Sequence, residues 1–120
     1  MENKKAKRLL DKIIDDTDQN GIDDSLIDSL KELREIVVEQ ELPVIAKVLR
    51  LTYQHLEAFE DFLVPIPEDE PLDEEQEKEN IKGKESISYL MNLIKHHDNK
   101  FNQEEIRHYI YYLEVFAEDD

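Results

Sequence analysis

The spacing of apolar residues is the feature that most limits what this chain can fold into. Across nearly the whole sequence they recur every three or four positions, the period of an amphipathic helix, and the strand period of two is absent. Only Gly21 and Gly83 interrupt the pattern as glycines. We therefore predict an all-α protein: one compact domain over residues 1–120, built as a bundle of about five helices.

Two amphipathic segments fill the first third of the chain. The first ends at the Asn20-Gly21 pair, which has the chemistry of a turn. The second begins after it, and one of residues 23–25 is expected to cap its first turn. The predicted buried stripes are Ala6, Leu9, Leu10, Ile13, Ile14 and Thr17, followed by Leu26, Leu30, Leu33 and Val37.

Pro43 separates the second segment from the third. Proline lacks an N–H and crowds the carbonyl group four residues earlier, so it either starts a new helix or kinks a long one. No glycine stands nearby to end the second helix, and the apolar stripe continues in phase. We therefore predict a sharp bend at Pro43 rather than a fully reversed hairpin. The segment 44–63 is the most apolar, and we expect it to be the central helix.

Residues 65–80 have the composition of a flexible acidic linker, with three prolines and dense carboxylates. A fourth helix is predicted over Ser86–His97. Asn102 and Glu105 resemble a capping box and are predicted to open a fifth helix. Because the connection between these two helices is short, we expect them to form an antiparallel hairpin.

The charge of the chain limits its partners. There are 31 acidic and 15 basic residues, a formal net charge of −16. Such a surface repels nucleic acids and anionic membranes and attracts basic molecules. We expect a basic protein partner, no nucleic acid and no membrane. The sequence shows neither a signal peptide nor a bilayer-spanning run, which leads us to expect a cytoplasmic protein.

Two groups of residues are candidates for partner contact. The first is acidic and belongs to the predicted linker: Glu68, Asp69, Glu70, Asp73, Glu74 and Glu75. It is either an arm that orders on a basic groove or a solvated spacer. The second group is aromatic and lies off the predicted core stripes: Tyr89, Tyr111 and Tyr112. It is either a partner surface or a second packing layer, covered by the central helix or by the mate in a homodimer.

One segment matches half of a calcium-binding loop. Its possible ligands are Asp16, Asp18 and Asn20, with Gly21 after them and Asp24 at the ninth position. The twelfth position, which needs a bidentate glutamate, is Ile27. We therefore predict no metal site, and an acidic turn between helices. Weak calcium binding by the turn at 16–28 is the alternative.

The sequence contains no recognisable catalytic constellation. It has no cysteine, no phosphate-cradling loop and no carboxylate at the centre of a predicted core stripe. The four histidines, His55, His96, His97 and His108, lack the spacing of a catalytic metal site. We predict no enzyme and no cofactor. The expected function is a protein–protein interaction or regulatory module of the inhibitor, immunity-like or adaptor kind. An unrecognised enzymatic site is the second alternative.

Overall fold

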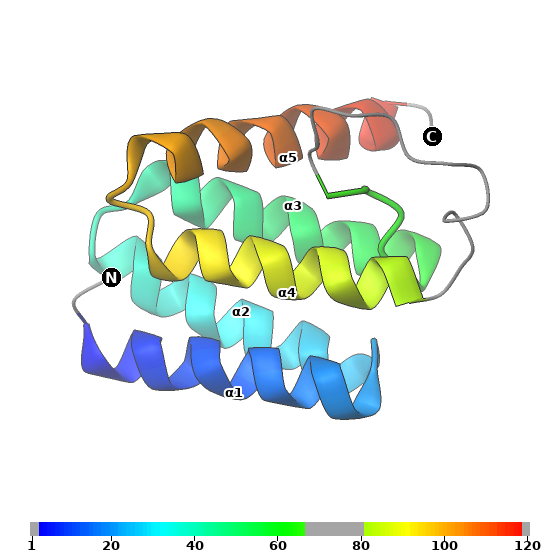
Figure 1. Ribbon diagram of the computed structural model, residues 1–120, viewed down its shortest axis with the longest axis horizontal. Coiled ribbons are helices and arrows are strands. Elements are labelled where there is room, and N and C mark those ends of the chain that lie inside the picture. Colours follow the sequence, from blue (N-terminus) through cyan, green and yellow to red (C-terminus); the bar gives the residue numbers. More distant parts are fainter. Residues whose placement is uncertain (1–2, 67–80, 119–120) are drawn as a thin grey trace.

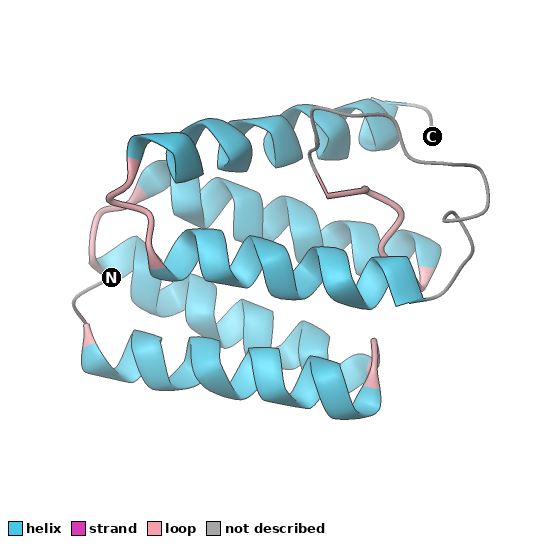
Figure 2. Cartoon of the chain, viewed as in Figure 1, coloured by secondary structure: helices cyan, strands magenta, loops and turns pink. Residues whose placement is uncertain are grey.

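The structure, a computed structural model, describes residues 3–66 and 81–118, which form five helices (Figure 1). The helices are α1 (Lys4–Asn20), α2 (Asp24–Glu39), α3 (Pro43–Phe59), α4 (Ile81–Lys95) and α5 (Lys100–Glu118). Within these described ranges the remainder is loop and turn, without a strand (Figure 2). The prediction of an all-α bundle of five helices is confirmed.

The helices contact one another in a closed order around a single core. α1 packs on α2, α2 on α3, α3 on α5, α5 on α4, and α4 returns to α1. In Figure 1, α1 and α4 lie in front of the other three helices. Every helix contributes to the core, whose largest fully buried side chains are Leu10, Ile13, Leu30, Leu33, Leu49, Leu56, Ile87, Leu90, Met91, Ile94, Ile106 and Tyr109.

The first two helices begin and end almost as their sequence predicts. Asn3 caps α1 by accepting a hydrogen bond from Ala6 N at 2.9 Å, and Asp23 caps α2 by accepting from Leu26 N at 3.1 Å. α1 ends at Gly21, whose φ of 77° suits glycine. All residues of the two predicted stripes are buried except Ile14, which is half-buried.

The chain turns further before Pro43 than predicted: it reverses, and α2 and α3 form an antiparallel hairpin (Figure 1). The reason is a Schellman motif that contains no glycine. Glu41 adopts the left-handed conformation, with φ of 60°. The Glu41 N–H donates to the Val38 carbonyl and the Leu42 N–H donates to the Val37 carbonyl, which satisfies the end of α2. Pro43 then occupies the first turn of α3, where its missing N–H does no harm.

α3 buries more residues than any other helix in the described structure, but it is not the central helix that was predicted: like each of the others it packs on two neighbours, here α2 and α5. It ends at Phe59 rather than near Leu63. Glu60 terminates it by adopting a left-handed conformation, with φ of 59°. The chain beyond stays attached to the bundle. Phe62 is buried, and the Leu63 N–H donates to Nε2 of the buried His55 at 3.1 Å.

The last two helices form the predicted antiparallel hairpin, but both begin earlier than expected. α4 starts at Ile81, and α5 starts at Lys100. The cap of α5 is Asn99, not Asn102: Asn99 Oδ1 accepts from the N–H groups of Phe101 at 2.8 Å and Asn102 at 3.3 Å. The Asn102 amide donates instead to the His96 carbonyl. Both asparagines can cap, and the tight turn between the helices selects the earlier one.

A polar pair lies inside the core between α4 and α5. The Tyr109 hydroxyl lies 2.9 Å from Ser86 Oγ and donates to the Ser86 carbonyl at 3.0 Å. Both residues are fully buried. Burial raises the pKa of Tyr109 above its ordinary value of 10.0, because the phenolate would lose its hydration.

We predict that Glu41→Gly stabilises the protein. Glycine adopts a positive φ without the steric penalty that a Cβ brings, so the free energy of unfolding should rise by about 0.5–1 kcal/mol. Urea denaturation measures the change. Glu41→Ala keeps the Cβ and is the matched control. An equal effect of the alanine would contradict this explanation and indicate that the lost charge is responsible.

We predict that Tyr109→Phe lowers the free energy of unfolding by about 1–2 kcal/mol, because the buried Ser86 hydroxyl loses its partner. The pKa of Tyr109 is raised in the folded state. The contribution of Tyr109 to the free energy of unfolding is therefore full below the pKa of the unfolded state, and it decreases as the pH rises above that pKa. The decrease approaches about 1.4 kcal/mol for each pH unit.

Denaturant titrations from pH 7 to 11, a range chosen around the reference tyrosine pKa of about 10, test this dependence. Tyr109→Phe should remove the part of the alkaline loss that comes from this residue. The exposed Tyr111→Phe is the control and should retain it. Identical alkaline profiles for the wild type and Tyr109→Phe would contradict the assignment.

Candidate partner-binding site

An acidic groove with a volume of about 780 Å³ opens on the described surface. It lies where the α1–α2 connection and the first half of α2 meet the end of α3. Five carboxylates and one ammonium group line it, together with three aliphatic side chains. The lining residues are Ile22, Asp23, Asp24, Ile27, Asp28, Lys31, Leu56, Glu57 and Glu60.

The helical period explains why these residues share one surface. Asp24, Asp28 and Lys31 follow one another at spacings of four and three residues, so α2 presents them on the same side. The α2–α3 hairpin then brings Glu57 opposite them. Ile27 packs against the core and Leu56 belongs to it, which gives the groove an apolar floor between acidic walls.

Lys31 shows how the groove holds a cation. Its Nζ lies 2.9 Å from Glu57 Oε2 and 5.4 Å from the centre of the Tyr53 ring. The hydrogen bond and the charge of Glu57 raise the pKa of Lys31. The Glu57 carboxylate and the Tyr53 ring therefore both contact the Lys31 ammonium group at the edge of the groove.

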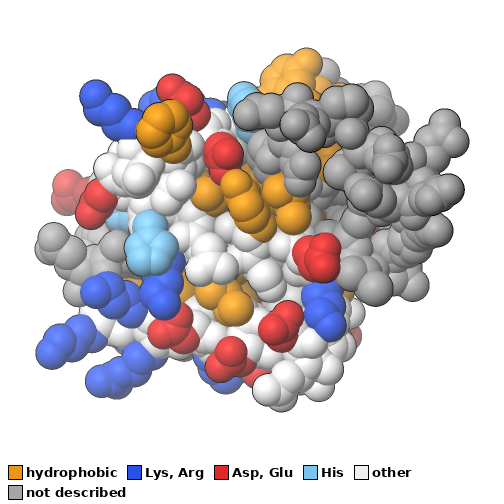
Figure 3. All heavy atoms as spheres, in the orientation of Figure 1, with side chains coloured by type: hydrophobic (Ala, Val, Ile, Leu, Met, Phe, Trp, Pro, Cys, Tyr) orange, Lys and Arg blue, Asp and Glu red, His pale blue; other side chains and the backbone are white. Residues whose placement is uncertain are grey.

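A second exposed surface, the α5 outer face, consists of Phe101, Tyr111, Tyr112 and Val115. Tyr111 is 62% exposed and Phe101 is 77% exposed. Figure 3 shows hydrophobic side chains at the upper edge of the molecule, where α5 lies. The opposite side of α5 is buried in the core, so this helix is apolar on two sides. Tyr111 and Tyr112 stay predicted partner contacts, and their exposure is what such contacts require.

The other predicted contact residues are placed differently. Tyr89 is half-buried, and its hydroxyl donates to the Glu105 carboxylate, so it joins α4 to α5. The six acidic residues predicted for partner contact lie outside the described residues: Glu68, Asp69, Glu70, Asp73, Glu74 and Glu75.

The half-matched calcium loop is not a loop in the structure. Asp16, Asp18 and Asn20 all belong to α1, where residues two apart point to nearly opposite sides. Asp16 pairs with Lys12 at 3.3 Å. Asp24 lies in α2 and lines the acidic groove instead. Among the residues with described positions, no three His, Asp or Glu side chains are grouped to hold a metal ion.

The four histidines lie in different environments. His55 is buried and is surrounded by the rings of Phe59, Phe62 and Phe116, with centroid distances of 4.7, 5.5 and 5.0 Å. His97 is half-buried, and its Nδ1 lies 3.6 Å from Asp98. His96 and His108 are exposed.

Comparison of the chain with family models, with curated proteins and with solved structures yields no match. As far as the described residues extend, none of the helices combines the length and the apolar character that crossing a bilayer requires.

We predict that the double variant Tyr111→Ser, Tyr112→Ser changes the free energy of unfolding by less than about 0.5 kcal/mol, because exposed side chains contribute little to folding. Thermal and urea denaturation at low protein concentration measure this effect. A larger loss would show that another surface covers these tyrosines. If that loss grows with protein concentration, the covering surface is a second copy of the chain.

Proposed function

We propose that this protein is a non-enzymatic binding module that captures a basic segment of a partner protein in the acidic groove. The observation that carries the proposal is the composition of the groove. Its walls carry Asp23, Asp24, Asp28, Glu57 and Glu60, and its floor is aliphatic. A segment that alternates cationic and apolar side chains complements both parts.

The overall charge supports this function through the rate of association. A formal charge of −16 attracts a cationic partner from a distance, and the carboxylates that converge in a concave surface strengthen the local field. At physiological salt this attraction extends over a screening length of about 8 Å, so the groove and its surroundings determine the encounter.

The contacts of Lys31 support the mode of binding. The groove already holds this ammonium group between Glu57 and the Tyr53 ring. Asp24 and Asp28 lie on the same side of α2 and form no ion pair with any residue whose position is described. In our proposal these carboxylates bind lysine or arginine side chains of the partner.

A synthetic peptide of about 12 residues that alternates lysine and leucine is a suitable probe of this chemistry. Calorimetry at about 50 mM and about 500 mM salt should show a steep loss of affinity as the salt concentration rises. The double variant Asp24→Asn, Asp28→Asn should bind the peptide about tenfold more weakly than the wild type at the lower salt concentration.

The double variant Glu35→Gln, Glu39→Gln is the matched control. Both residues are exposed on α2 and lie outside the groove, and the variant removes the same charge. It should keep most of the affinity. An equal loss in both variants would refute the groove as the binding site and leave only a diffuse electrostatic attraction. Affinity that does not depend on salt would refute the electrostatic mechanism.

A further inference from the structure

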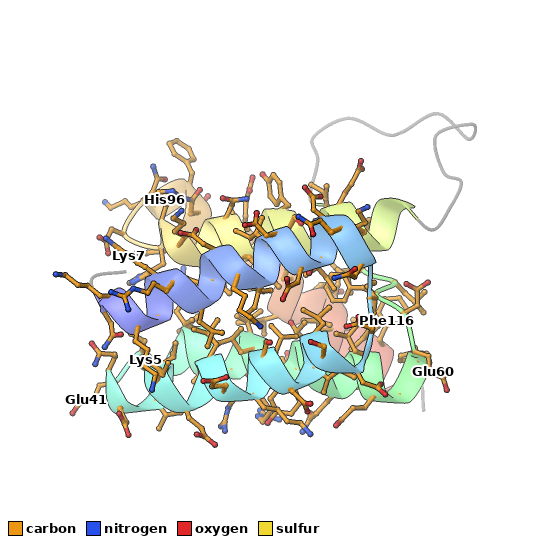
Figure 4. The ribbon with its side chains drawn as sticks, turned by 90° about the horizontal axis from the view of Figure 1, so that it is seen from below. Lys5, Lys7, Glu41, Glu60, His96 and Phe116 are labelled. Carbon is orange, nitrogen blue, oxygen red and sulfur yellow. The ribbon has the colours of Figure 1, made fainter. Side chains whose placement is uncertain are left out.

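The start of α1 and the turn from α4 to α5 form a cationic cluster on this acidic protein. Residues 3–12 and 95–102 contain seven Lys and Arg residues and two Asp, a formal charge of +5, which leaves −21 for the rest of the chain. Figure 4 shows Lys5 and Lys7 of α1 at the same end of the molecule as His96 and Glu41, opposite the end that carries Glu60. Figure 3 shows Lys and Arg side chains gathered beside a histidine at the lower left.

The cations of the first turns of α1 are unpaired within the described structure. Lys4, Lys5, Lys7 and Arg8 are exposed, and no described carboxylate forms an ion pair with them. Their position is also unfavourable, because the N-terminal end of a helix is the positive end of its dipole. Although the chain has 31 acidic residues, none of them lies in the first turn of α1, where a negative charge would be favourable. Within the described structure these cations are therefore available to an anionic ligand.

A hollow of about 560 Å³ opens between the start of α1 and the turn from α4 to α5. Cationic and amide side chains dominate its lining, which consists of Lys7, Lys95, His96, Asp98, Asn99 and Asn102. Asp98 is the one acidic residue among the described lining residues, and its carboxylate lies 3.6 Å from His97. Asp11 brings a second carboxylate to the hollow through its ion pair with Lys95.

Contacts within the fold hold two of these donors in place. Lys95 Nζ binds Asp11 Oδ1 at 2.7 Å, which fixes an ammonium group between α4 and α1. Asn99 uses its Oδ1 to cap α5, so its Nδ2 group is the end left to donate to a ligand. Lys7 approaches from α1 and His96 from the turn. The donors thus come from two separate parts of the chain.

We propose that this hollow binds a phosphoryl group. A phosphate presents three or four oxygen acceptors in a compact anion, which matches several donors arranged around a small volume better than the two oxygens of a carboxylate do. Asn3 already caps α1, so side chains rather than the helix terminus form the site. A long polyanion does not suit it, because a nucleic acid backbone would extend from the cationic cluster into the negative field of the remaining surface.

The test is an NMR titration of the ¹⁵N-labelled full chain with inorganic phosphate and with pyrophosphate, at ionic strength held constant with sodium chloride. Saturable shifts are expected for the amides of Lys7, His96 and Asn99. Pyrophosphate should bind more tightly because it carries more charge. A phosphoserine peptide, titrated in parallel, shows whether the group is also bound when a peptide carries it.

The variant Lys7→Gln should weaken pyrophosphate binding about tenfold. Lys12→Gln removes the same charge from the same helix outside the hollow and should leave the affinity nearly unchanged. Both residues are exposed, so circular dichroism should show an intact fold for each variant. Equal losses in the two variants would overturn the proposal, and so would shifts that grow linearly with phosphate as they do with chloride. Groove variants such as Asp24→Asn should not alter this binding, so the outcome is independent of the proposed capture of a basic partner.

Discussion

The structure depends on the fact that α3 has two buried sides. One side packs on α2 and the other on α5, so α3 connects the first hairpin to the last. The residues that it buries are Ile45, Ala46, Val48, Leu49, Leu51, Thr52, His55 and Leu56. Hydrophobic burial of this extent on a single helix requires more than one neighbour, and α2 and α5 supply them. The remaining helices complete the closed order, and one continuous core follows. The charged residues are then confined to the outer surface of each helix.

The sequence was sufficient for the helices and for the turn at Asn20-Gly21, but not for the reversal before Pro43 or for the cap of α5. An apolar stripe such as that from Leu26 to Val37 determines which side of a helix is buried, and this depends on periodicity alone. The reversal depends on Glu41, a non-glycine residue that adopts a positive φ. No sequence pattern predicts this conformation at a glutamate. The cap at Asn99 was missed for a similar reason: Asn102 has the same chemistry, and only the geometry of the turn distinguishes them.

The candidate surfaces show the same difference. The net charge was evident from composition, but the grouping of charged residues into an acidic groove and a cationic cluster depends on packing. The walls of the groove come from α2 and α3, which face each other only because the chain reverses before Pro43. Spacing alone could have indicated that Asp24, Asp28 and Lys31 share a face. Their position opposite Glu57 could not be inferred without the hairpin.

The contact between α1 and α4 has a consequence for biosynthesis. The ion pair from Lys95 to Asp11 joins residues 84 positions apart, and the same interface buries the apolar side of α1. On the ribosome, α1 emerges long before α4 has been translated. Part of the apolar surface of α1 therefore stays exposed to solvent while the middle of the chain is synthesised. Nascent chains that stall before the last hairpin would therefore expose apolar surface to which chaperones bind. Translation of the final third of the polypeptide lets that surface be buried and completes the folded domain.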